Sequence, residues 1–175
     1  MRLVKTTVIG LLSFVISSCA TGYTEPSSET PHSNFIFQKS VSSKLLFRGE
    51  EPTIVTYQVY KDSECKEPVP AANFGPTSKK EKTLKFNANA PQRLVVNMVY
   101  KTGSIGVVNG VAVPIGPIEQ KNCIGFAKFT PQEKQSYKLS AQPTDNPEVC
   151  VLNVVNVATE EAPIDLIQTE EDVCK

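Results

Sequence analysis

Residues 53–60 read Thr-Ile-Val-Thr-Tyr-Gln-Val-Tyr, and this stretch decides the fold class. Alternate side chains of an extended chain share a face, so one face of this stretch would carry Thr53, Val55, Tyr57 and Val59. Both faces are partly apolar, and β-branched and aromatic residues dominate, which is typical of a strand inside a β-sheet. The stretch therefore predicts a β-strand with a buried face.

The same alternation recurs along the chain. Further strands are predicted at 34–39, 44–47, 83–87, 92–101, 123–129, 137–141 and 149–157. Three prolines and a glycine make 68–82 a predicted loop, and its basic run 79–82 either solvates the loop or forms a partner patch. Roughly seven to nine strands without a convincing helix predict a single all-β domain, an antiparallel β-sandwich over residues 34–157.

One connection between strands carries a recognisable pattern. Phe129 is followed by the proline-led turn Thr130-Pro131-Gln132-Glu133-Lys134-Gln135-Ser136 and then by Tyr137. This resembles the entry to a late strand in immunoglobulin-like and transthyretin-like sandwiches. The resemblance implies that the ring of Tyr137 packs inward while its hydroxyl group bonds nearby backbone.

Residues 102–118 contain no charged side chain, and Asn109-Gly110 lies between two valine-rich runs. Asn-Gly favours a type I′ turn, because both central positions need positive φ, so a β-hairpin is predicted here. In one interpretation the hairpin projects and offers a partner-binding surface, made by Val108, Asn109, Gly110, Val111, Val113 and Ile115. In the other, the same apolar residues fill the core or protect a sheet edge.

Five cysteines constrain the compartment and the chemistry. Setting Cys19 aside leaves Cys65, Cys123, Cys150 and Cys174, an even number that predicts two disulfides in an exported protein. Four cysteines allow three pairings, and we expect Cys65 with Cys123 and Cys150 with Cys174. No two of these cysteines are close in sequence and His32 is the single histidine, so neither a metal site nor a metal cofactor is predicted.

The N-terminus is predicted to be a signal peptide, residues 1–18, with Arg2 and Lys5 before an apolar run. Its end, Ile16-Ser17-Ser18-Cys19, resembles the lipobox of bacterial lipoproteins. That resemblance implies a diacylglycerol on the Cys19 thiol, an acyl chain on its amino group, and, with Ala20 next, attachment to the outer membrane. The alternative is an ordinary cleaved signal peptide, with Cys19 as a further disulfide cysteine.

The regions flanking the sandwich are polar. Residues 19–33 are predicted to be the lipidated cysteine and a flexible linker, which would span about 45–50 Å at full stretch. Residues 158–175 are predicted to be an acidic tail pinned by Cys174. Cleavage would remove 18 of 175 residues and two of the 18 basic ones, leaving 157 residues with a formal charge of −2. With this weak charge, the chain has no strong overall field for nucleic acid or anionic lipid.

We expect no enzymatic activity and no catalytic residues, because His32 falls in the linker and no carboxylates or glycines form a catalytic motif. Two functions stay open. The first is a structural or interaction component of a cell-envelope assembly with a protein partner; a lipidated cysteine, tether and small sandwich resemble type VI secretion outer-membrane lipoproteins in architecture only. The second is a tethered ligand-binding or inhibitor module for peptidoglycan, a glycan or an enzyme. The absence of tryptophan favours the first. Oligomeric state stays open.

Overall fold

The computed structural model describes residues 22–39, 51–60, 68–102, 105–109, 111–114, 116–117 and 119–169. Eleven strands form the described part: β1 His32–Gln38, β2 Glu51–Tyr60, β3 Pro68–Phe74, β4 Glu81–Asn87, β5 Gln92–Thr102, β6 Ile105–Val108, β7 Val111–Pro114, β8 Glu119–Phe129, β9 Ser136–Pro143, β10 Cys150–Asn156 and β11 Ile167–Thr169. The predicted strand at 44–47 lies outside the described residues.

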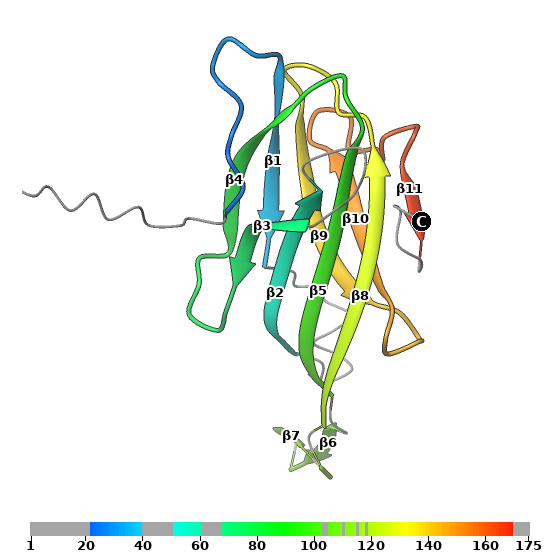
Figure 1. Ribbon diagram of the computed structural model, residues 1–175. Helices are drawn as coiled ribbons and strands as arrows, with labels where there is room; N and C mark the ends of the chain where they lie inside the picture. Colours follow the sequence, from blue (N-terminus) through cyan, green and yellow to red (C-terminus); the bar gives the residue numbers. More distant parts are fainter. Residues whose placement is uncertain are drawn as a thin grey trace, which may run out of the picture.

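Two sheets pack face to face and confirm the predicted β-sandwich (Figure 1). One sheet has the order β10-β9-β1-β4, and the other has the order β11-β8-β5-β2-β3. Strand pairing is antiparallel within both sheets, except that β1 runs parallel to β9. Strands β5 and β8 form the longest ladder, from Gln92 opposite Phe129 to Thr102 opposite Glu119.

Period-two alternation places one face of each main strand in the core. On β2 the buried side chains are Val55, Tyr57 and Val59, as the opening stretch predicted. Aromatic rings fill the middle of the sandwich: the ring of Phe35 stacks on Phe86 at 4.2 Å and lies 5.3 Å from Phe129, measured between ring centroids. Burial of these large rings is the main source of stability for a domain of this size.

Tyr137 occupies the position that the sandwich resemblance implied. Its side chain is only 2 % exposed, and its ring packs edge-on against Phe129 at 5.1 Å between centroids. Its hydroxyl oxygen accepts a hydrogen bond from the backbone N–H of Gln132 at 2.9 Å. The prediction for Tyr137 is confirmed.

The predicted loop at 68–82 is wrong over most of its length. Residues Pro68–Phe74 form β3, and residues from Glu81 onward belong to β4, so only the turn between them is irregular. Strand β3 is the edge of its sheet and pairs with β2 alone. An edge strand tolerates proline because one side of its backbone needs no ladder donor, which is why Pro68 and Pro70 misled the prediction.

The predicted flexible linker is also corrected over residues 22–33. The backbone N–H of Tyr23 donates to the carbonyl oxygen of Pro70 at 3.0 Å, and its ring stacks on Phe86 at 4.3 Å between centroids. His32 begins β1, and Ser33 is fully buried. Polar composition predicted a linker, but one aromatic side chain with a core pocket is enough to order this segment.

The start of the predicted acidic tail folds back onto the sandwich. Strand β11 pairs with β8, with Ile167 opposite Lys128, and the carboxylate of Asp165 accepts a hydrogen bond from the N–H of Thr130 at 2.8 Å. Leu166 packs against the core, whereas Ile164 is fully exposed. Residues 158–169 are therefore part of the folded domain, while Cys174 lies outside the described residues.

The expected disulfide pairing is wrong, because Cys123 is bonded to Cys150 with a Cα–Cα distance of 5.2 Å. Cys123 lies on β8 and Cys150 on β10, so the bridge joins the two sheets. The turn before β10 carries the chain across to β8, where the N–H of Ile124 donates to the carbonyl oxygen of Glu148 at 3.0 Å. Neither expected pair can then form, and the other two cysteines, Cys65 and Cys174, lie outside the described residues.

Replacing Ser33 by alanine should raise the free energy of unfolding by about 1 kcal/mol. The Ser33 hydroxyl is buried and has no hydrogen-bond partner. No interaction compensates its desolvation, so removing the hydroxyl should stabilise the fold. Urea denaturation measures the change. Ser136→Ala is the matched control, because that hydroxyl accepts a hydrogen bond from Asn34 at 3.4 Å and its loss should not stabilise. A destabilised Ser33→Ala protein would contradict the assignment.

Candidate functional site

The valine-rich hairpin forms a two-stranded sheet of its own, separate from both layers of the sandwich. Strand β6 pairs with β7 from Ile105 opposite Pro114 to Val108 opposite Val111, with Asn109 in the turn between them. Asn109 is exposed and has a φ of 53°, as a type I′ turn requires. The hairpin prediction is confirmed in its backbone and register.

The hairpin lies beyond the end of the longest ladder of the sandwich. The pairing of β5 with β8 ends at Thr102 and Glu119, and the chain between them makes the hairpin. Figure 1 shows β6 and β7 below the lower ends of β5 and β8, away from the two packed layers. Because it joins neither main sheet, the hairpin does not act as an additional strand of the sandwich.

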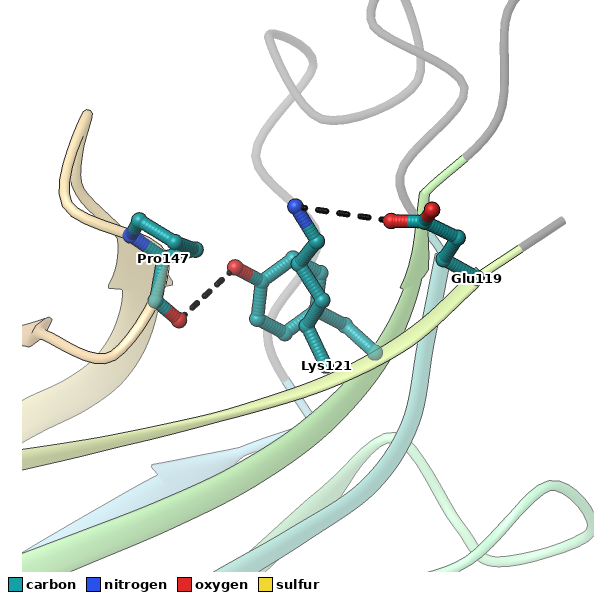
Figure 2. Close-up of polar contacts among 4 residues, drawn as sticks. Glu119, Lys121 and Pro147 are labelled. Carbon is teal, nitrogen blue, oxygen red and sulfur yellow. Dashed lines mark hydrogen bonds and ion pairs between the residues drawn. The ribbon is translucent and has the colours of Figure 1, made fainter.

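The end of the sandwich that carries the hairpin is firmly braced. The hydroxyl group of Tyr100, on β5, donates a hydrogen bond to the carbonyl oxygen of Pro147 at 3.0 Å, which ties the turn before β10 to the ladder (Figure 2). On β8, Lys121 and Glu119 form an ion pair at 3.7 Å on the exposed side (Figure 2). The Cys123–Cys150 bridge joins β8 to β10. The hairpin thus leaves the sandwich at an end that a hydrogen bond and a disulfide tie together.

The predicted site residues fall into two groups. Val108 ends β6, Val111 and Val113 lie in β7, and Asn109 is at the turn, so one hairpin brings these four together. Gly110 and Ile115 of the hairpin, together with the lipidation residue Cys19, lie outside the described residues.

A second feature lies at the other end of the sandwich, and the sequence alone did not indicate it. A cavity of 520 Å³ opens between the β8–β9 turn and the segment leading into β11. Its lining is mixed: the polar side chains include Gln132, Asn156, Glu161 and Asp165, with Tyr137 at the inner wall. The lining comes from two segments distant in sequence, 130–137 and 156–165, so no local motif could have identified it.

Within the described ranges, no three His, Cys, Asp or Glu side chains are grouped as metal ligands would be. The described part of the chain also has no helix of the length and apolar character needed to cross a membrane.

Comparison with protein-family models, curated proteins and solved structures finds no match to this chain.

Proposed function

We propose that this protein is a lipid-anchored component of a bacterial cell envelope that works by protein–protein contact, with the β6–β7 hairpin as its contact element. The observation that carries the proposal is the hairpin's place outside both sheets, on a braced end of the sandwich. A hairpin that adds no strand to either sheet contributes little to folding, so a role in binding accounts best for its presence.

The composition of the hairpin supports a protein partner. No charged residue occurs from Thr102 to Ile118, a run of uncharged residues that is unusual for a segment outside a core. Interface centres are depleted of charge and enriched in apolar side chains. A nucleic-acid or anionic-lipid partner would instead call for basic residues.

The anchor rests on the lipobox resemblance at Ile16 to Cys19. The Cys123–Cys150 disulfide supports export, because such bonds persist in oxidising compartments. Two or more acyl chains on Cys19 would hold the protein stably at the outer membrane, where a single chain would bind only reversibly.

Photo-crosslinking in cells tests the contact. A photoreactive residue at position 109, at the hairpin turn, should give one dominant protein adduct. The matched control is position 138 on the exposed outer face of β9, where we expect none. Equal adducts from both positions, or none from position 109, would contradict the proposal.

The alternative, a tethered ligand-binding module, is favoured by one observation, the cavity beside Tyr137. Cavities of about 300–1,000 Å³ with a few polar groups are typical small-molecule sites. A photoreactive residue at position 164, on the cavity rim, separates the two functions. Crosslinking to glycan at position 164, without any adduct at position 109, would favour the ligand-binding module over the assembly component.

A further inference from the structure

Tyr23 closes the open edge of the sandwich on one side. Strand β3 is the edge of one sheet and β4 the edge of the other, and Tyr23 contacts both. Its N–H donates to Pro70 on β3, while its hydroxyl group donates to the carbonyl oxygen of Lys85 on β4 at 3.0 Å. Burial raises the pKa of the Tyr23 phenol, with Glu25 adding to the rise, so the hydroxyl stays a donor. The N-terminal segment is thereby fixed to this edge.

The fixed position of Tyr23 shortens the tether that the sequence predicted. Only four residue steps separate Cys19 from Tyr23, and they span at most about 14 Å. The full linker would instead have allowed about 45–50 Å. If Cys19 is lipidated, as the proposed function requires, Tyr23 lies no further than this from the lipid headgroups. The β3–β4 edge is then the part of the domain nearest the membrane.

Basic side chains on the β3–β4 edge favour an orientation with this edge toward the membrane. Exposed Lys79 and Lys80 lie in the turn between β3 and β4, and Lys82 and Lys85 follow on β4. The ammonium group of Lys82 donates to the carbonyl oxygen of Ala71 at 2.8 Å, which holds its side chain along the edge. Among the described residues of this edge the acidic ones are Glu25 and Glu81, and the Glu81 carboxylate accepts a hydrogen bond from Gln38.

The opposite edge of the sandwich carries acidic side chains. Strands β10 and β11 end the two sheets on that side, and Figure 1 shows β11 across the molecule from β3 and β4. The segment between β10 and β11 carries the exposed acidic residues Glu160, Glu161 and Asp165. The sandwich is therefore basic along one edge and acidic along the other, and an anionic surface would attract the basic edge.

We propose that the β3–β4 edge lies against the membrane that holds the lipid anchor, with Lys79 and Lys80 contacting the phosphate groups of anionic lipids. This inference rests on the proposed lipid anchor. The tether keeps Tyr23 within about 14 Å of the membrane surface, and turning the β3–β4 edge toward that surface would bring the lysines within the Debye length of about 8 Å at physiological ionic strength. The β6–β7 hairpin belongs to neither edge and stays free for its partner.

The test uses the full-length lipidated protein in vesicles of phosphatidylethanolamine and phosphatidylglycerol. A photoreactive residue is placed at position 79 on the basic edge or at position 167 on β11, which is exposed on the acidic side. Lipid adducts should be about fivefold or more abundant from position 79, since each lysine near an anionic surface changes binding by about this factor. Equal adducts, or more from position 167, would overturn the proposal.

Two variants sharpen the experiment. A flexible insertion of glycine and serine between Ala20 and Thr21 should lower lipid adducts from position 79 while leaving the protein on the vesicles. Lys80→Glu should lower them as well, whereas Lys138→Glu, on the outer face of β9, should not. Unchanged adducts after the insertion would mean that the short tether does not set the orientation, and would overturn the inference.

Vesicle flotation separates this inference from the proposed anchor. The lipidated protein should float with the vesicles, and Cys19→Ala should not. If both float equally or neither floats, the anchor itself is wrong. If flotation depends on Cys19 but adducts show no preference for position 79, the anchor stands and only the orientation fails.

Discussion

Replacing Gly125 by alanine should lower the free energy of unfolding by about 2–3 kcal/mol. Strand β8 approaches β10 so closely here that a Cβ at position 125 would overlap the carbonyl group of Cys150. Elsewhere in a strand, replacing glycine by alanine raises the free energy of unfolding by about 0.5–1 kcal/mol, because it reduces the backbone entropy of the unfolded chain. The sign of the change therefore reports the close approach, and urea denaturation measures it.

The control for this prediction is Gly75→Ala. A Cβ at position 75 would have ordinary contact, 3.8 Å from the hydroxyl oxygen of Ser78. Its stability should stay within about 0.5 kcal/mol of the unchanged protein. If Gly125→Ala were as stable as this control, β8 and β10 would not be in contact at that position.

The double change Cys123→Ala and Cys150→Ala should lower the free energy of unfolding by about 3–4 kcal/mol. The bridge spans 27 residues in sequence, and closing a loop of this length restricts the unfolded chain. Both cysteines are buried, so alanine is preferred to serine, which would add buried hydroxyl groups. Denaturation of the oxidised proteins with and without the change measures the difference.

Peptide mapping under non-reducing conditions is the control for the connectivity. It should recover the peptide of Cys123 linked to that of Cys150, and Cys65 with Cys174 as the remaining pair. Recovery of Cys150 linked to Cys174, the pairing expected from sequence, would contradict the structure.

The hairpin and the strands were predictable because their signals are local. Asn109-Gly110 between valines specifies a turn through its own φ preferences, and the alternation at Val55, Tyr57 and Val59 specifies a buried face. Tyr137 was predictable for a related reason, since its spacing from Phe129 reflects a turn of fixed length. Each of these features depends on neighbours within about ten residues.

Other features depend on partners far away in the chain. Tyr23 lies in a segment whose composition predicts a linker, and only Phe86 and the edge of β3 give it a place to bind. Strand β3 contains prolines that predict a loop, and only its position at the sheet edge makes them acceptable. The pairing of Cys123 with Cys150 also depends on tertiary structure, because it requires β10 of one sheet to approach β8 of the other.

The sequence by itself determined an all-β sandwich, its Asn-Gly hairpin and the expectation of a lipid anchor at Cys19, because periodicity, turn residues and short motifs act through neighbouring residues. Only the tertiary structure decided the Cys123–Cys150 bridge, the docking of Tyr23 and the separation of a basic edge from an acidic one. These features depend on which distant segments meet, and that choice is made by packing two sheets around one core.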